Sequence, residues 1–361
     1  MLSDQAVRYM SLAAQADSAG NVSPSDGGPD PSAVAIGREL LRVIFGHRRA
    51  SVSIPDEFAA LAAHPANAEA FTAVWDRVNY IFEADPRVKS AAAGILAAFF
   101  RRESDAGDTQ ALIALGDLLR YQHQHEEARD AYRRAADAGN SHARIALARE
   151  LAYGLGDFDG ARMAYREAIG GADPEVAAEA LVQLGYLLAS EFRDNAAAEA
   201  AFREAIRTGH SQWAPAATMG LAYLREQQGD LDAACYIYQE MIDDASPEAA
   251  HAAVVLGEIL EDRGDIAGAK AGYWRAIDSG TGAWAAHALV NLLNILEQEG
   301  DLEGVREAHH RAVQTGNSDA SYGLIVTGQM LQDRGDAEGA RAAFEQARAT
   351  GVDAYPTPDG F

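Results

Sequence analysis

The sequence is short of several kinds of residue, and each shortage narrows the possibilities. A single cysteine, Cys235, among 361 residues excludes a disulfide within the chain and suits a reducing compartment. The longest apolar run, Ala91 to Phe100, is far too short to cross a bilayer, and the N-terminus lacks the basic start and apolar stretch of a signal peptide. We therefore expect a cytoplasmic protein that does not bind membranes.

Basic residues are scarce as well. The chain has 30 Lys and Arg against 54 Asp and Glu, and only Lys89 and Lys270 are lysine. The excess of acidic residues is unevenly distributed. Residues 1–105 have 13 acidic and 10 basic side chains, whereas residues 106–361 have 41 acidic and 20 basic side chains. Such a field repels phosphate backbones, so we expect no nucleic acid as a partner. The acidity fits either a well-solvated surface or attraction to a basic partner.

Alanine is abundant, whereas aromatic residues make up only 8% of the chain, and much of the alanine recurs at a fixed interval. Seven blocks close on a small residue or methionine, at Ala135, Ala168, Ala205, Met241, Ala276, Ala312 and Ala347, and most carry an aromatic residue three positions earlier. A period of about 35 residues indicates stacked helical hairpins. The turn between the two helices of a hairpin recurs as Gly-Asp, for example Gly264-Asp265, because glycine accepts a positive φ and aspartate caps the next helix.

These blocks resemble the tetratricopeptide repeat family, with Sel1-like features. The resemblance lies in a small residue within the first helix, as in Leu256-Gly257, and in the alanine–aromatic–alanine pattern Ala269–Tyr273–Ala276 in the second. The sixth block departs from it, with Val305–His309–Ala312. The resemblance implies an all-α fold, a right-handed α-α superhelix or solenoid of about seven hairpins, in which helices approach closely at the small residues and the aromatic ring fills the space between neighbouring pairs.

The organisation that we expect has four parts. Residues 1–34 form a short helix over 3–16 and a flexible linker over 18–32, and residues 35–105 form an N-terminal helical cap with helices over 36–49, 56–63, 68–83 and 87–103. Seven repeats occupy 106–350, and 351–361 is a tail. A glycine such as Gly139, Gly170 or Gly209 ends the second helix of most repeats.

In arrays of this kind the first helix of each pair lines the binding groove, and here that face is acidic and bears tyrosines. Aspartate and glutamate accept hydrogen bonds from Arg or Lys, and tyrosine gives amphipathic contact area. The same face carries Asp117 and Glu150 in the first two repeats. The residues that we assign to the peptide-binding groove are Tyr186, Tyr223, Glu226, His251, Glu258, Glu261, His287, Asn294, Glu297 and Tyr322.

We therefore expect a non-catalytic scaffold or adaptor that binds a protein or peptide bearing basic residues. A peptide-sensing transcriptional regulator and an accessory partner of an enzyme are the alternatives. Trp213 and Trp284 hold the same place in two repeats and could either anchor a partner or fasten the loop between repeats.

No catalytic motif is visible, and we expect no cofactor and no metal site. The pairs His123/His125 and His309/His310 have poor spacing for chelation. The glycines at 154, 156 and 160 follow no strand and match an ordinary repeat turn, not a phosphate loop. We interpret Cys235 as an inert buried thiol. The identity of the partner and the oligomeric state do not follow from the sequence.

Overall fold

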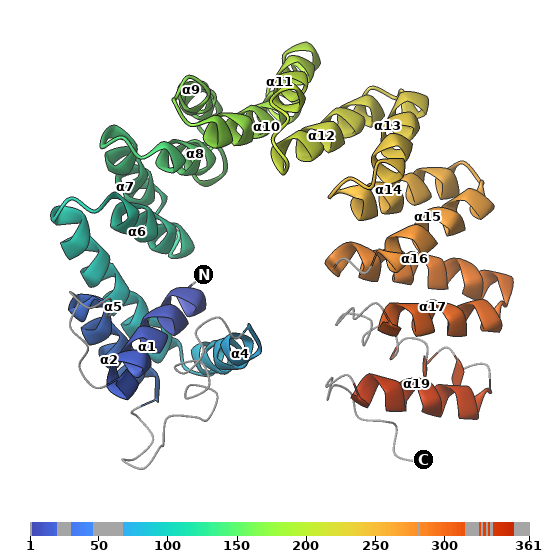
Figure 1. The fold of residues 1–361 in the computed structure, drawn as a ribbon, viewed down its shortest axis with the longest axis horizontal. Helices are drawn as coiled ribbons and strands as arrows, with labels where there is room; N and C mark the ends of the chain where they lie inside the picture. Colours follow the sequence, from blue (N-terminus) through green and yellow to red (C-terminus); the bar gives the residue numbers. More distant parts are fainter. Residues whose placement is uncertain are drawn as a thin grey trace. The chain divides into compact units, whose positions relative to one another are not determined.

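The structure, a computed structural model, describes residues 2–19, 30–45, 68–279, 282–314 and 335–349, together with 325, 328, 329, 331 and 332. It is all-α, with helices packed as sequential hairpins (Figure 1). By its contacts the chain divides into two compact units, Met1–Ala180 and Leu181–Phe361. The domain boundaries expected from the sequence stay predictions.

Among the described residues of unit 1, four helices precede the repeats. They are α1 Leu2–Ala19, α2 Pro31–Phe45, α4 Ala68–Ala84 and α5 Pro86–Asp105. Helix α1 packs against α2, α4 and α5, and the Trp75 Nε1 donates to Asp4 Oδ1 over 3.0 Å to join α4 to α1. Helix α2 starts earlier than expected, since Asp30 Oδ1 accepts the backbone N–H of Ser32. The helix expected over 56–63 lies outside the described residues.

The repeats follow as pairs of helices. In unit 1 they are α6 Thr109–Tyr121 with α7 His125–Asp137, then α8 Ser141–Arg149, which continues as the π-helix η2 Glu150–Gly154, with α9 Phe158–Ile169. Helix α10 Pro174–Ser190 contains the division between the units. Unit 2 continues with α11 Asn195–Arg207, α12 Trp213–Gln227, α13 Leu231–Asp243, α14 Ala249–Asp262, α15 Ile266–Asp278, α16 Gly282–Glu299, α17 Leu302–Gln314 and α19 Ala337–Ala349.

The Gly-Asp turns form as predicted. Gly264 has φ 81°, and Asp265 Oδ1 accepts the backbone N–H of Gly268 at 2.9 Å to cap α15. The same cap forms at Asp157, Asp230, Asp301 and Asp336. Gly139, Gly170 and Gly209 each follow the end of a second helix, as predicted; Gly139 and Gly209 have a positive φ, whereas Gly170, the C-cap of α9, has φ −74°.

Close approach of paired helices at glycine is also confirmed. A Cβ placed on Gly257 of α14 would lie 2.6 Å from Tyr273 Cε1 of α15, so only a residue without a side chain fits there. Ala269, Tyr273, Ala276 and Ile277 are all fully buried and lie on one face of α15. The aromatic ring therefore fills the space that the glycine leaves, and the same pairing joins Gly185 to Phe202.

Candidate functional site

Two first helices of unit 2, α14 and α16, bring an aromatic stack to the surface. The rings of His251 on α14 and Trp284 on α16 lie 3.6 Å apart and nearly parallel, at 10°. His287, one turn after Trp284, lies beyond it at 6.1 Å and 18°. The stack fastens one repeat to the next, and it leaves 36% of Trp284 exposed to solvent. Trp284 thus contacts the preceding repeat and keeps an accessible surface, and its role as an anchor for a partner stays a prediction.

Carboxylates surround this stack. Glu258 Oε1 accepts a hydrogen bond from Asn291 Nδ2 at 3.1 Å and lies 3.3 Å from His287 Nε2. Glu248 Oε2 lies 3.6 Å from His251 Nδ1. Burial lowers the pKa of His251, and the nearby Glu248 partly opposes that shift. We call the set of Glu248, His251, Glu258, Trp284, His287 and Asn291 the α14–α16 cluster.

Two other predicted groove residues, Glu226 and Glu261, have a role within the hairpins. The buried Tyr273 hydroxyl donates to Glu261 Oε2 at 2.9 Å, and the buried Tyr238 hydroxyl donates to Glu226 Oε1. Burial raises the pKa of both tyrosines, and the adjacent carboxylates add to the shift. These glutamates therefore hold the second helix to the first and keep a negative charge at the first-helix surface.

Two of the three predicted groove tyrosines are among the described residues, and they differ in exposure. Tyr223 on α12 is 47% exposed, and its hydroxyl accepts a hydrogen bond from Gln227 Nε2 at 2.7 Å. Tyr186 on α10 is half-buried and packs edge-on against Phe202, with ring centroids 5.1 Å apart. Burial raises the pKa of Tyr186, and the negative charge of Glu248 contributes to the shift. Only Tyr223 offers a broad accessible face.

The remaining predicted groove residues lie at the C-terminal end of the region. Asn294 is exposed and Glu297 is half-buried, both on α16. Tyr322 lies outside the described residues. The structure thus brings His251, Glu258 and His287 together in one cluster. Asn294 takes part in none of the contacts described for that cluster.

Sequence reasoning left Glu248 and Asn291 out of the cluster and did not pair Trp284 with His251. The signal that could have found them is the repeat interval, because both His251–Trp284 and Glu258–Asn291 are separated by 33 residues. Residues about one repeat apart lie on neighbouring first helices, so their side chains can meet.

In unit 1 two expected groove carboxylates lie in other surroundings. Glu150 is only 1% exposed, and its Oε1 lies 2.7 Å from His125 Nδ1, so its assignment to the groove is wrong. The reason is local: the Glu150 carboxylate lies against Gly154, where an added Cβ would collide with it, and beside the His125 ring. Asp117 accepts the hydroxyl of the buried Tyr132 at 2.6 Å, as Glu261 does for Tyr273.

Other sequence features have simple structural roles. The stretch from Gly154 to Gly160 is a helix cap, with Asp157 Oδ1 accepting the Gly160 N–H at 2.9 Å. Cys235 is half-buried, and burial raises the pKa of its thiol, which disfavours the reactive thiolate. In the described part of the chain no three His, Cys, Asp or Glu side chains are grouped so as to hold a metal ion. No described helix combines the length and apolar character that a bilayer crossing needs.

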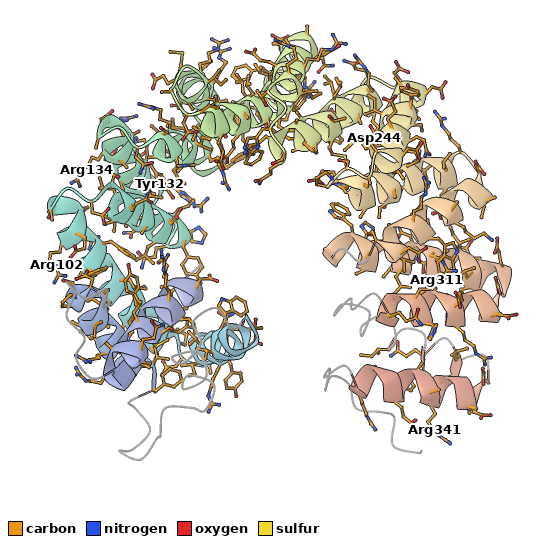
Figure 2. All side chains as sticks on the ribbon, in the orientation of Figure 1. Arg102, Tyr132, Arg134, Asp244, Arg311 and Arg341 are labelled. Carbon is orange, nitrogen blue, oxygen red and sulfur yellow. The ribbon has the colours of Figure 1, made fainter. Side chains whose placement is uncertain are left out.

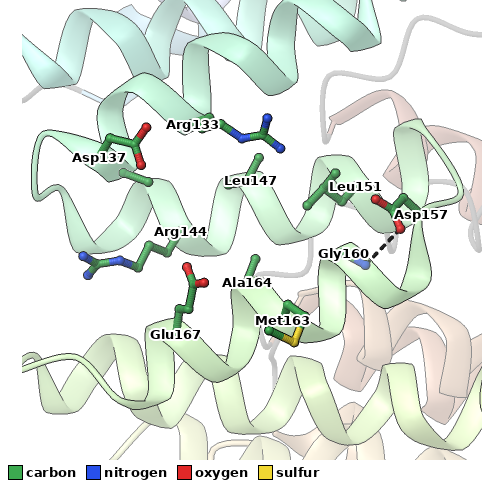
Figure 3. Close-up of a pocket in the computed structure, with 11 residues that line it drawn as sticks. Arg133, Asp137, Arg144, Leu147, Leu151, Asp157, Gly160, Met163, Ala164 and Glu167 are labelled. Atoms are coloured by element: carbon green, nitrogen blue, oxygen red, sulfur yellow. Dashed lines mark hydrogen bonds between the residues drawn. The ribbon is translucent and has the colours of Figure 1, made fainter.

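Unit 1 has a cavity of about 560 Å³ between α7, α8 and α9 (Figure 3). Arg133 and Arg144 lie near Asp137 and Glu167, while Leu147, Leu151, Met163 and Ala164 supply the apolar part. Charges of both signs alternate around it, so its chemistry selects no one class of partner.

Comparisons with known proteins found no matching family model and no matching curated protein. Solved structures similar to the chain include a tetratricopeptide repeat protein from Parabacteroides merdae, at 20% identity and TM-score 0.39, over 76% of this chain and 91% of that one. A chain of the APC/C hetero-tetramer Cut9–Hcn1 matches at 16% identity and TM-score 0.39, over 81% of this chain and 51% of that one. Yeast Tom70 matches at 16% identity and TM-score 0.48, over 97% of this chain and 78% of that one.

None of these structures bears on the Sel1-like features, and likenesses at such identities say nothing of function. The hairpins themselves carry the fold assignment, through their turns, their period and the glycine–aromatic contacts. The chain folds as an all-α array of helical hairpins that resembles tetratricopeptide repeats.

Proposed function

We propose that the protein is a non-catalytic scaffold that binds a basic segment of a partner protein on the first-helix surface of unit 2. Helical-hairpin arrays generally offer extended binding surfaces, and enzymes use them as accessory parts. The surface in question consists of the α14–α16 cluster together with Tyr223, Glu226 and Glu261.

One observation carries the proposal: the carboxylates of this surface have no arginine or lysine partner within the described residues. Glu226 and Glu261 accept from tyrosine, and Glu248 and Glu258 face histidines. Many basic side chains of unit 2 pair with other acids, as in Arg225–Glu199, Arg263–Asp232, Lys270–Glu299, Arg275–Asp243, Arg306–Asp336 and Arg311–Asp278. A partner with Arg or Lys would supply the missing cations.

Arg311 is one of the basic residues whose ion pair lies away from the proposed binding surface. It lies on the second helix α17 (Figure 2), where it pairs with Asp278 at 3.1 Å, and its guanidinium sits 4.8 Å from the centre of the Trp274 ring. The same chemistry, a cation near both an aromatic ring and a carboxylate, is available at Trp284 and Glu258 without an internal arginine. An arginine of a partner could make both contacts there.

The test uses a matched pair of double variants. Glu248→Gln with Glu258→Gln removes two negative charges from the cluster, whereas Glu204→Gln with Glu303→Gln removes two from exposed positions on second helices. Binding of fluorescent arginine-rich peptides is followed by anisotropy, with citrulline versions of the same peptides as neutral controls.

We expect wild-type protein to prefer the arginine peptides and to lose them at about 0.5 M salt, where screening acts within a few ångströms. The cluster variant should weaken binding by about tenfold, which corresponds to about 1.4 kcal/mol. Equal binding by the cluster variant and the second-helix variant would contradict the proposal.

A further inference from the structure

A cavity in unit 1, separate from the surface described above, has the composition of a binding site. It measures about 490 Å³ and opens between α1, α5 and α6, with the start of α2 at one side. Its size lies within the usual range for ligand sites, about 300–1,000 Å³. Arg8 and Gln110 at its edge are exposed, so the cavity is accessible from solvent.

Aromatic rings line one side of this cavity. Tyr9 of α1 packs edge-on against Phe99 of α5, with centroids 5.3 Å apart, and lies 6.0 Å from Phe100. Both phenylalanines are buried, and Tyr9 is half-buried, with no hydrogen bond to its hydroxyl among the described residues. Phe99 already accommodates a cation, because the Arg102 guanidinium lies 5.4 Å from its centre.

The charges around these rings are mostly negative. Four carboxylates line the cavity, Asp30, Glu103, Asp108 and Asp117, and Arg8 is the one basic residue of the lining, while Arg102 pairs with Glu103 and Arg120 with Asp117. Burial raises the pKa of the Tyr9 hydroxyl, Arg8 opposes this shift, and Asp108, Glu103 and Asp30 add to it, so these charges act on the same space.

The acceptors of the cavity are only partly used. Asp108 Oδ1 caps α6 through the Gln110 N–H at 2.8 Å, and Glu103 Oε1 accepts from Arg102 at 2.8 Å. In both residues the contacts described involve one oxygen. Gln5 Oε1 is buried and accepts no hydrogen bond from the described residues. A buried acceptor without a donor is costly, and a donor brought by a ligand would satisfy it.

We propose that this cavity binds an arginine side chain presented by a protein partner. A guanidinium has five N–H donors in one plane, so it can reach several separate acceptors while its flat face lies against Tyr9. A lysine ammonium would satisfy fewer of them and stacks less well on an aromatic ring. Arg8 at the edge adds a preference for an acidic residue next to the bound arginine.

The test measures binding of a short acetylated and amidated peptide with one central arginine, by saturation-transfer NMR and calorimetry. It is done in the Glu248→Gln/Glu258→Gln background, so that binding to unit 2 is weakened and the two proposals can fail separately. Citrulline, which keeps the shape and removes the charge, and lysine replace the arginine in two control peptides.

We expect the arginine peptide to bind at least about tenfold more tightly than the citrulline peptide. The double variant Glu103→Gln/Asp108→Asn, whose asparagine can still cap α6, should weaken arginine binding by about tenfold. Asp105→Asn, an exposed change at the end of α5 that lies outside the cavity lining, should leave it unchanged.

Three results would overturn the proposal. Equal binding of the arginine and citrulline peptides would show that charge is not recognised. Equal effects of the Glu103→Gln/Asp108→Asn variant and the Asp105→Asn variant would place binding elsewhere. If free arginine amide binds as tightly as the peptide, the cavity is a site for a small cation and not for a protein partner.

Discussion

Replacing Gly257 with alanine tests the packing on which every hairpin depends. The added Cβ would lie 2.6 Å from Tyr273 Cε1 and 2.9 Å from Cδ1, whereas carbon atoms at rest are about 3.5–4.0 Å apart. Tyr273 is fully buried and its hydroxyl is bonded to Glu261, so the ring must move by about 1 Å against packed neighbours. Overpacking of this kind costs about 1–3 kcal/mol.

Two further terms decide the net effect. Alanine favours a helix interior over glycine by about 1 kcal/mol, which offsets part of the loss. Displacing the ring also strains the Tyr273–Glu261 hydrogen bond, and bonds to charged groups contribute about 1.5–3 kcal/mol. We therefore expect Gly257→Ala to lower the free energy of unfolding by about 1–3 kcal/mol.

Gly94→Ala is the matched control. Gly94 lies within α5, is exposed, and has nothing within 4 Å of an added Cβ. There the helix propensity acts alone, so alanine should stabilise by about 0.5–1 kcal/mol.

Urea unfolding followed by circular dichroism gives both values, and hydrogen exchange of the α14 and α15 amides localises the change in unit 2. If Gly257→Ala is as stable as Gly94→Ala, the close approach of the paired helices is refuted. Gly257→Ala should lower the free energy of unfolding less in the Tyr273→Leu variant than in wild type, since the two sites are coupled.

Three further perturbations test other contacts. Tyr273→Phe removes the donor to Glu261 and should destabilise by about 1–3 kcal/mol in the same urea assay, while Tyr236→Phe, at an exposed hydroxyl on α13, should change stability little. Ala276→Leu should cost about 1–3 kcal/mol because Ala276 is fully buried, and an unchanged melting temperature would argue against tight packing there. Because the folded pKa of His251 is below its ordinary value of about 6.5, the unfolded chain takes up the proton first, so stability should fall as pH drops below about 6.5. His251→Gln should reduce that pH dependence.

The sequence predicts the elements that depend on neighbours along the chain. A glycine with positive φ and a following aspartate cap involve only four or five residues, and the turn at Gly264-Asp265 formed as expected. The burial of Tyr273 and Ala276 follows from their spacing on one helix face together with the repeat period. Periodicity does not show that a side chain is covered by its neighbours, as the Glu150 carboxylate is by Gly154 and His125.

The site was harder to predict because its contacts join different helices. The stack of His251 on Trp284 depends on the rotation between α14 and α16, which the repeat period does not give. The hydrogen bonds of Tyr238 and Tyr273 require a glutamate side chain that reaches across a hairpin. The sequence assigned Glu226 and Glu261 to the groove surface and did not show that they also join the two helices of a hairpin. The cavity beside Tyr9 gathers four helices and has no signature in the sequence.

Site-specific photo-crosslinking tests the central claim most directly, that the first-helix surface of unit 2 holds a basic segment. A benzoylphenylalanine replaces either Tyr223, 47% exposed on the first helix α12, or Tyr236, 64% exposed on the second helix α13. The account predicts crosslinks to an arginine-rich peptide from position 223, strongly reduced by Glu248→Gln/Glu258→Gln, and few from position 236. Crosslinking that is as strong from position 236, or that is as strong in the double variant as in wild type, would contradict it.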